Sequence, residues 1–364
     1  MYFQQSSNDD DAIAQILLKH EALEVEHGDG DAGNFLFGWQ CQNPYANELL
    51  LNVKKHSEGI DHVKYIYLED NHELTQRVKN MQLGFDGVMP SGLFCAPGGA
   101  VSVLFSFCAF LSRRGVSEVY YVAPIYYSMH IALKLFGIRV RAVSGLHAFE
   151  AGFTMNLPDK NTVLILADPV WYVGISVPDQ AIAEIIRWQN KTESLVFVDG
   201  SFQYMRWNEI ITEASAKLNP EKTFRLVSPT KSLGVHGYRF AYTLLPEDFL
   251  TEFSNTYTNI YGSTAADNLA FAFEAISAME KRSLTNSLIR LAKERHERLR
   301  KKGAISSVLK PECGYFAFEK INVTLPKGYL MMTGDYFDQN RFPEYSRINL
   351  ISPSFCVLDP ELHG

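Results

Sequence analysis

Short apolar runs alternate with amphipathic stretches through the middle of the chain. Four of these runs have the length and composition of buried strands: Val119–Val122, Val163–Leu166, Leu195–Val198 and Thr223–Val227. Largely apolar runs are typical of strands that are covered on both faces, and helical patterns separate them here. This succession predicts βαβ units, and therefore an α/β fold with a mostly parallel central sheet.

Two other patterns predict helices. The longest nearly continuous apolar run, Val101–Leu111, is too short to span a bilayer and favours a buried helix. The run from Arg290 to Lys302 is basic and follows Leu284 and Leu288 at helical spacing. That arrangement indicates an amphipathic helix with a solvated basic face, and Ser283 is a candidate for its cap.

A polar or aromatic residue follows each predicted strand within a few positions. Tyr126 comes soon after the first strand, Asp168 after the second, Asp199 after the third and Lys231 after the fourth. Ligands of open parallel sheets bind at the carboxyl ends of the strands, so chemistry is expected at this edge. Each residue alone also allows a plainer interpretation, because aspartates cap helices, aromatic side chains pack, and lysines are common in solvated loops.

The segment Ser228–Arg239 resembles the cofactor-lysine signature of fold-type I pyridoxal-phosphate (PLP) enzymes, the aspartate aminotransferase superfamily. The resemblance implies that Lys231 forms a Schiff base with the cofactor aldehyde. It also implies that Ser228 and Arg239 bind the cofactor phosphate. The fold expected from it is fold type I, with a mostly parallel central sheet and a smaller α+β domain.

Asp199 supports the same resemblance, because it precedes the lysine by about thirty residues, as in the family. The corresponding aspartate pairs with the pyridine nitrogen of PLP and keeps it protonated. A protonated ring withdraws electrons from the substrate α-carbon, which makes PLP an electron sink.

A glycine pair stands before the predicted apolar helix. Gly98, Gly99 and Ala100 occupy the positions that bind phosphate in the family's loop. Free amides and the positive end of a helix favour an anion at such a place. The segment is neither a Walker A loop nor a complete dinucleotide fingerprint.

Three further positions resemble the family's ligand contacts. Tyr126 stands where an aromatic ring stacks on the pyridine, and Arg347 stands where an arginine holds the substrate α-carboxylate. A planar guanidinium suits that task, since it meets both carboxylate oxygens. Tyr65, or alternatively Tyr67, is the candidate for the tyrosine that reaches across a dimer to the neighbouring phosphate.

Two positions depart from the family pattern. Trp171 occupies the place of an asparagine, and Phe202 the place of a tyrosine, that donate to the phenolic oxygen of the cofactor. Hydrogen bonds to an anionic oxygen favour its charged form, so their loss changes the electronics of the site. The indole N–H of Trp171 or the hydroxyl of Tyr172 is a candidate substitute, and the plainer interpretation is that Trp171 only packs.

Composition adds few constraints. The 364 residues are 46% hydrophobic and 21% charged, and a net charge of −7 gives no sign of a nucleic-acid or membrane partner. The five cysteines have no paired spacing, which favours a reducing cytoplasmic compartment and gives no sign of a metal site.

The expected organisation is an N-terminal segment 1–44, which contributes to a small domain, a large PLP-binding domain 45–255 and the rest of the small domain, 256–364. The resemblance further implies a homodimer.

Several functions stay open at this point. The leading interpretation is an aminotransferase that exchanges an amino group between an α-amino acid and a 2-oxo acid. The alternative uses the same site for elimination, replacement, cyclisation or oxidation of a specialised amino acid, because the protein decides the fate of the PLP-stabilised carbanion. A PLP-binding regulatory protein without catalysis is the third. The motifs of serine hydrolases and zinc proteases, Gly-x-Ser-x-Gly and His-Glu-x-x-His, do not occur.

Overall fold

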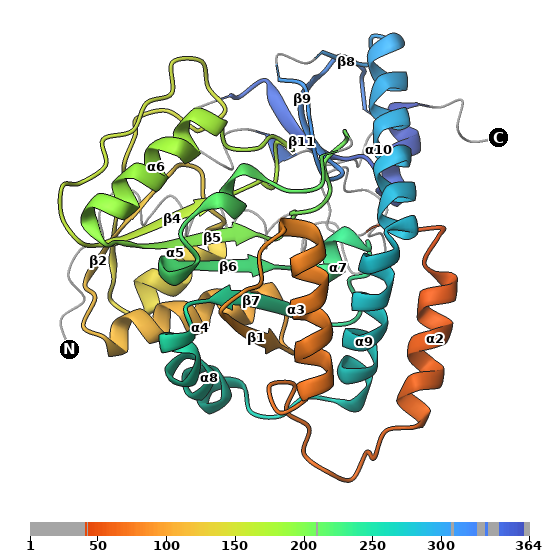
Figure 1. Ribbon diagram of the computed structural model, residues 1–364. Helices are drawn as coiled ribbons and strands as arrows, with labels where there is room; N and C mark the ends of the chain where they lie inside the picture. The colour runs from red at the N-terminus through yellow and green to blue at the C-terminus, as the bar shows by residue number, and fades with distance from the viewer. Residues whose placement is uncertain are drawn as a thin grey trace, which may run out of the picture.

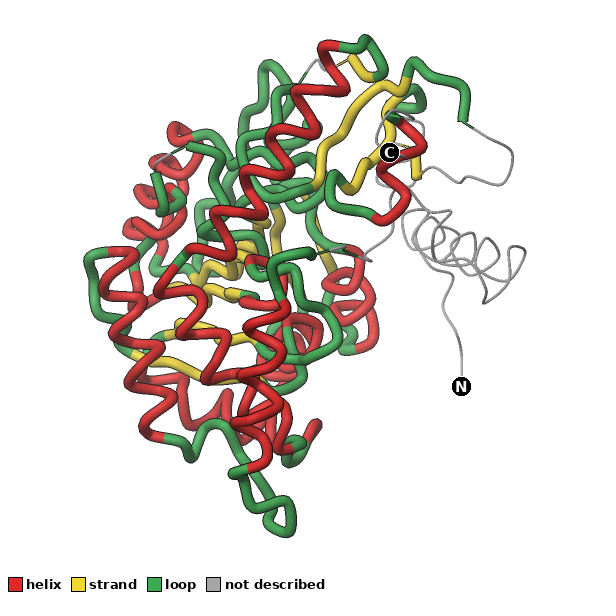
Figure 2. Tube along the Cα trace, turned by 90° about the vertical axis from the view of Figure 1, so that its right-hand side faces the viewer, coloured by secondary structure: helices red, strands yellow, loops and turns green. Residues whose placement is uncertain are grey.

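The computed structural model describes residues 41, 43–208, 210–306, 309–325, 332–333 and 342–359. A large sheet lies at the centre of this part of the chain, and a smaller sheet lies beside the long helix α10 (Figure 1). Helices form the outer layers, as the view turned by 90° shows (Figure 2). The described part of the chain thus has the mixed α/β architecture that the sequence predicts.

Seven strands form the large sheet. Their spatial order is β1 (Gly92–Ala96), β7 (Ala241–Leu245), β6 (Thr223–Val227), β5 (Leu195–Gly200), β4 (Val163–Ala167), β2 (Glu118–Tyr121) and β3 (Arg139–Ala142). β7 pairs antiparallel with both of its neighbours, and the other neighbouring pairs are parallel. The carboxyl ends of β1, β2, β4, β5 and β6 therefore lie at one edge, which is the arrangement expected for the candidate site.

Alternating side chains attach the sheet to helices on both faces. Phe197 and Phe224 point to one face, where Phe107 contacts their rings at centroid distances of 4.4 and 5.1 Å. Leu166 and Val198 belong to the cluster on the other face. Strand residues that alternate between two apolar layers explain why the sequence shows largely apolar runs.

The helices cover these two faces and lead to the second sheet. Their bounds are α2 (Asn47–Glu58), α3 (His72–Asp86), α4 (Ala100–Arg113), α5 (Tyr127–Leu135), α6 (Asp179–Thr192), α7 (Pro229–Ser232), α8 (Glu247–Tyr261), α9 (Ala266–Lys281) and α10 (Ser283–Lys301). α4 is the predicted apolar helix. In α10, Leu284 and Leu288 are buried as expected, but Arg282 rather than Ser283 occupies the cap position, with φ 57°.

The smaller sheet has the order β10 (Met332–Thr333), β11 (Tyr345–Asn349), β9 (Phe316–Ile321) and β8 (Ile305–Ser306), and all of its neighbouring pairs are antiparallel. On β11, Arg347 stands opposite Phe318 of β9. The sheet's place beside α10 agrees with a smaller second unit (Figure 1), while the boundaries 1–44, 45–255 and 256–364 stay a prediction.

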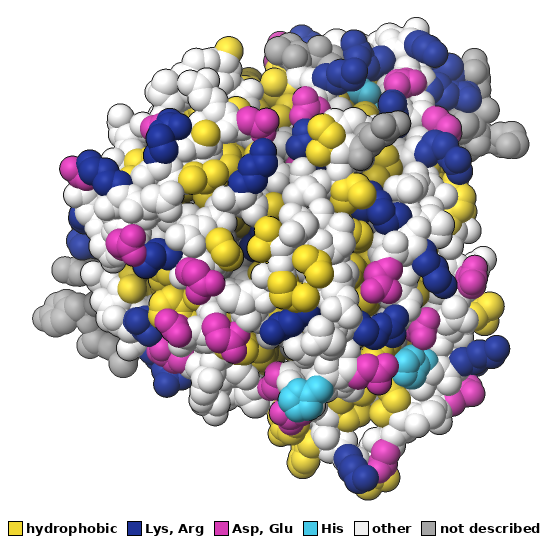
Figure 3. All heavy atoms as spheres, viewed as in Figure 1, with side chains coloured by type: hydrophobic (Ala, Val, Ile, Leu, Met, Phe, Trp, Pro, Cys, Tyr) yellow, Lys and Arg dark blue, Asp and Glu magenta, His cyan; other side chains and the backbone are white. Residues whose placement is uncertain are grey.

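On the face shown in Figure 3, basic and acidic side chains are interspersed. Within the described residues, none of the helices combines the length and the apolar composition needed to cross a membrane.

Candidate active site

Asp199 lies at the carboxyl end of β5, beside the end of β4, where its backbone pairs with Ala167. The carboxylate accepts two hydrogen bonds from Ser201, at 3.1 Å from the backbone N–H and 2.6 Å from the hydroxyl. Burial raises the pKa of Asp199, while these bonds and the nearby Lys231 act in the opposite direction. A positive charge beside this carboxylate would favour its ionised form, which burial disfavours.

Lys231 lies in α7, the single helical turn that follows β6. Burial lowers the pKa of its amine to about 8, and the positive charges of Arg347 and Arg239 act in the same direction. Roughly a tenth of the amine is then neutral at pH 7, far more than for an exposed lysine. The neutral amine is the form that attacks a carbonyl or takes up a proton.

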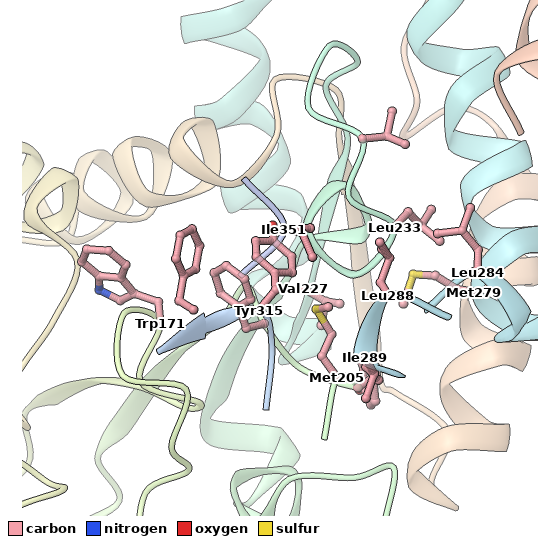
Figure 4. Packing of buried hydrophobic residues seen from close by; sticks show 14 of the residues in the cluster. Trp171, Met205, Val227, Leu233, Met279, Leu284, Leu288, Ile289, Tyr315 and Ile351 are labelled. Carbon is pink, nitrogen blue, oxygen red and sulfur yellow. The ribbon is translucent and has the colours of Figure 1, made fainter. Parts of the chain in front are cut away.

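The lysine turn is fixed by apolar packing. Leu233 directly follows α7 and lies beside Leu284 and Leu288 of α10 (Figure 4). A Cβ on Gly234 would lie 3.0 Å from Leu288 Cδ1, and the backbone there has φ 60°. The close approach to α10 explains the glycine at this position of the lysine segment.

The glycine pair meets an arginine at the same edge. Gly99 has φ 77°, and a Cβ there would lie 3.1 Å from Arg239 Nη2. The N–H of Gly98 donates to the hydroxyl of Tyr257 at 2.8 Å, and α4 begins at Ala100. A guanidinium and the amino end of a helix of fourteen residues thus lie together, which favours an anion.

Ser228 joins β6 to the lysine turn. It is buried, its carbonyl accepts from the N–H of Lys231 at 2.9 Å, and its hydroxyl lies 3.0 Å from that of Thr230. The predicted phosphate contact thus stands at the bend between β6 and α7.

Aromatic rings surround Arg347, whose side chain is only 1% exposed. The guanidinium carbon lies 5.2 Å from the ring centre of Trp171 and 4.8 Å from that of Phe316. Tyr126 meets Trp171 edge to face, with ring centres 5.2 Å apart. Burial lowers the pKa of Arg347 to about 10, and the neighbouring tyrosines, Tyr126 first, act in the opposite direction.

The two departures from the family pattern have different surroundings. Phe202 stands next to the lysine, with its ring centre 5.9 Å from Lys231 Nζ. Trp171 lies between Tyr126 and Arg347, in the buried cluster that also contains Tyr315 (Figure 4). The hydroxyl of Tyr172, the other candidate donor, lies 3.4 Å from His147 Nδ1.

The family model for aminotransferase class I and II matches residues 89–352, well over half of the chain. The chain belongs to this family. The aminotransferases of class I and II depend on PLP, so PLP is the cofactor of this protein. This is the superfamily that the lysine segment resembles.

Solved structures of aminotransferases share the fold of this family member. A probable N-succinyldiaminopimelate aminotransferase from Thermus thermophilus is 16% identical, with a TM-score of 0.77 over 94% of this chain and 97% of its own. YbdL from Escherichia coli, which has a methionine aminotransferase function, is 17% identical, with a TM-score of 0.75 over 99% of this chain and all of its own. An aspartate aminotransferase from Thermotoga maritima is 16% identical, with a TM-score of 0.74 over 97% of both chains. No curated protein sequence matches.

The aminotransferase site has the features that its cofactor requires. The Cβ that would touch Arg239 is absent at Gly99, so the backbone can approach a phosphate closely. A buried carboxylate at Asp199 suits a protonated ring nitrogen, and the amine of Lys231 has a lowered pKa. The donor set of the site therefore fits PLP.

The residue predicted to act across a dimer lies in an exposed loop. Tyr65 is 82% exposed and lies in the loop between α2 and α3, which extends from the lower end of the molecule (Figure 1). The loop is attached through Ile66, whose carbonyl accepts from the N–H of Thr264 at 2.9 Å. Tyr67 in the same loop is partly buried.

Sequence patterns missed a polar cluster next to Lys231. His236 Nε2 lies 3.2 Å from Cys41 Sγ and 3.3 Å from the hydroxyl of Tyr315. Burial lowers the pKa of His236 to about 3, with Lys231 acting in the same direction, so the ring is neutral. With the ring proton on Nδ1, Nε2 can accept a hydrogen bond from either the thiol or the phenol. The sequence contained one sign of this cluster: His236 lies within the segment Ser228–Arg239 that carries Lys231.

The described residues give no indication of a metal centre in this aminotransferase. They contain no group of three or more histidine, cysteine, aspartate or glutamate side chains that is arranged to hold a metal ion.

Proposed function

We propose that the protein transfers an amino group between an α-amino acid and a 2-oxo acid, with Lys231 as the residue that holds PLP. One observation carries this proposal. Lys231, with a pKa lowered to about 8, is buried close enough to a carboxylate, Asp199, and to an arginine of the smaller sheet, Arg347, for both charges to act on its amine. In this proposal Lys231 holds the cofactor and transfers the proton. Asp199 pairs with the ring nitrogen, and Arg347 binds the substrate carboxylate.

When bound, PLP supplies an electron sink that stabilises negative charge at the substrate α-carbon. Asp199 is assigned to the pyridine nitrogen, where a positive charge would favour the ionised carboxylate that burial disfavours. Tyr126 is assigned to the face of the ring. Gly98, Gly99, Ala100, Ser228 and Arg239 are assigned to the phosphate.

Lys231 is assigned a second role as the base and acid of the reaction. Its neutral amine would take the proton from the substrate α-carbon and, as an ammonium group, would then give it up on the cofactor side. The lowered pKa supports this role, because an amine with a pKa near the working pH is neutral often enough to accept a proton. Arg347 orients the substrate by binding both carboxylate oxygens.

Phe202 favours a second candidate function. A ring without a hydroxyl stands beside Lys231, where the family has a donor to the phenolic oxygen. Trp171 occupies the other donor position and lies against Tyr126 and Arg347. A site with weaker donors at that oxygen suits elimination, replacement, cyclisation or oxidation of an amino acid as an alternative to transamination.

A homodimer is part of the proposal. Arg239 is exposed on the single chain, although it is assigned to the phosphate. Its backbone N–H donates to Asn268 at 3.2 Å, and Asn268 donates to Thr264, the residue that attaches the Tyr65 loop. A second subunit at this surface would cover Arg239 and receive Tyr65.

We place the protein in the cytoplasm. All five cysteines lie in described segments, and none of them forms a disulfide bond. Thiols that stay reduced suit a compartment with a reducing poise.

The decisive experiment compares the wild type with Lys231→Ala after purification with PLP. The wild type should show the visible absorption of a protein-bound cofactor, and Lys231→Ala should lose it. Lys217→Ala, which changes an exposed lysine, serves as the control. Retention of the wild-type absorption in Lys231→Ala would refute the assignment of the lysine.

The reaction type requires a second measurement. Amino acids are incubated with the wild type, with and without a 2-oxo acid. Transamination gives a new amino acid only when the 2-oxo acid is present. Ammonia released without an acceptor would instead support the second candidate function.

A further inference from the structure

β6 carries a buried arginine between apolar neighbours. The side chain of Arg225 is only 8% exposed, and its guanidinium pairs with the carboxylate of Asp86, the last residue of α3. A charged group inside a sheet requires a counter-charge and hydrogen-bond partners for all of its donors. Asp86 provides the counter-charge but not all of the hydrogen bonds.

Asp86 belongs to a network whose other hydrogen-bonding side chains are uncharged, although Glu213 acts on Tyr204 from outside it and Arg282 donates to the carbonyl of Tyr204. The hydroxyl of Tyr204 donates to Gln82 Oε1 at 2.9 Å and lies 3.3 Å from both oxygens of Asp86. The amide of Gln82 donates to the hydroxyl of Tyr242 at 2.6 Å. Burial raises the pKa of both tyrosines, so they stay neutral. The network therefore contains one positive and one negative charge.

Two polar atoms at this place have no hydrogen-bond partner within the part of the chain that the structure describes. They are Arg225 Nη1 and Ser91 Oγ, and both are buried. Unpaired buried donors are rare in folded proteins, and those that occur usually mark a water molecule or a ligand. The position therefore calls for a hydrogen-bond acceptor.

A pocket of about 150 Å³ lies at these two residues. A water molecule needs roughly 10–15 Å³ of such space, so the pocket has room for a small organic molecule. Its other walls are mostly apolar and include Val88, Met89, Leu218 and Leu245. Apolar walls with a few polar anchors are typical of small-molecule sites.

The pocket is separate from the site of Lys231. Its wall includes the starts of β1 and β6 and the end of β7, at Gly92, Thr223 and Leu245. These positions form the amino edge of the sheet, opposite the edge at which α7 follows β6 (Figure 1). A ligand here would not compete with PLP or the substrate, and the inference does not depend on the proposed reaction.

We propose that this pocket binds a small uncharged molecule with an apolar body and a carbonyl oxygen. The carbonyl accepts hydrogen bonds from Arg225 Nη1 and Ser91 Oγ, and the body contacts the apolar wall. The charge of Arg225 is already matched by Asp86, so a carboxylate ligand would bring an unmatched charge into a buried place. A neutral amide or ketone avoids this cost.

The test compares two probes of nearly the same shape, isocaproamide and isocaproate, by ligand-observed NMR on the full chain. Isocaproamide should bind, and isocaproate should bind at least about tenfold more weakly because of its charge. Ser91→Ala should weaken the binding of the amide about two- to tenfold, as expected for one lost hydrogen bond.

A pocket-filling variant separates this site from other binding. Ala216 lines the pocket and is partly exposed, so Ala216→Trp should block it while leaving Arg225 and Asp86 in the chain, whereas Lys217→Trp changes an exposed neighbour that does not line it. Binding should be lost in Ala216→Trp and kept in Lys217→Trp. The proposal is overturned if isocaproamide does not bind the wild type, if Ala216→Trp binds it equally well, or if isocaproate binds as tightly.

Discussion

The ring of Phe202 stands 5.9 Å from the amine of Lys231 and brings no hydroxyl to the place where the family has one. Phe202→Tyr should therefore restore a donor to the phenolic oxygen of bound PLP. A donor favours the charged oxygen, so the pH at which the visible absorption changes should fall by roughly one unit. The measurement is a spectroscopic pH titration.

Phe136→Tyr is the matched control for this titration, because Phe136 is a partly buried residue at the end of α5, outside the described site. It should leave the midpoint where it is. An unchanged midpoint in Phe202→Tyr would show that position 202 does not contact the phenolic oxygen.

The amine of Lys231 should determine how PLP rebinds to the cofactor-free protein. With its pKa lowered to about 8 by burial, the neutral fraction rises about tenfold per pH unit below pH 8 and levels off above it. The rate of cofactor binding, followed by absorption, should show this profile. A rate that still rises above pH 9 would point to a lysine with an ordinary pKa.

Gly99→Ala should weaken cofactor binding at least about tenfold, since its Cβ would lie 3.1 Å from Arg239 Nη2, in the place proposed for the phosphate. The positive φ of 77° adds a backbone cost of about 1 kcal/mol or more. Gly152→Ala separates the two effects, because Gly152 has φ 81° and nothing within 4 Å of a Cβ. Both variants should lose thermal stability, but Gly152→Ala should bind PLP normally.

Arg347→Lys should raise the KM for amino acids about tenfold or more, because an ammonium group does not reproduce the two parallel hydrogen bonds of a guanidinium. Steady-state kinetics with a saturating 2-oxo acid would measure it. Arg295→Lys is the control, since Arg295 also lies over an aromatic ring, at 4.7 Å from the ring centre of Phe355. Equal KM values for Arg347→Lys and the wild type would place the substrate carboxylate elsewhere.

The proposed exchange of Tyr65 between subunits can be tested by mixing variants. Tyr65→Ala and Lys231→Ala should each be weakly active or inactive alone. A mixed dimer would contain one site with an intact lysine and an intact tyrosine from the other chain, so the mixture should exceed the sum of its components. Tyr67→Ala in place of Tyr65→Ala shows which tyrosine is used, and no gain with either would contradict the exchange.

The sequence predicted the elements of this site well because each depends on local patterns. Apolar runs marked the strands, and the positions of Asp199 at the carboxyl end of one strand and of Lys231 soon after another were sufficient to place both at the shared edge. The range Thr223–Val227 agrees with β6 at both ends. Local patterns also predicted that an apolar helix follows the glycine pair, as α4 does.

Contacts between distant segments were not predictable in this way. Cys41 meets His236 only because the chain folds back over 195 residues, and Asp86 meets Arg225 across 139. No spacing rule connects such residues, since their proximity is a product of the sheet order and of helix packing. The exposure of Tyr65 likewise depends on the course of a loop that has no periodic pattern.

The reversed direction of β7 brings three of the predicted phosphate contacts, Gly99, Ser228 and Arg239, to one edge of the sheet. Because β7 runs opposite to β1 and β6, it starts where they finish, and Arg239 stands just before its first residue, Ala241. The chain thus runs from Ser228 to Arg239 along this edge. Arg239 there lies next to Gly99, which follows β1, the other neighbour of β7. A parallel strand in this place would put its arginine at the opposite edge of the sheet. The direction of one strand therefore decides whether Arg239 lies close enough to Gly99 and Ser228 to share one phosphate with them.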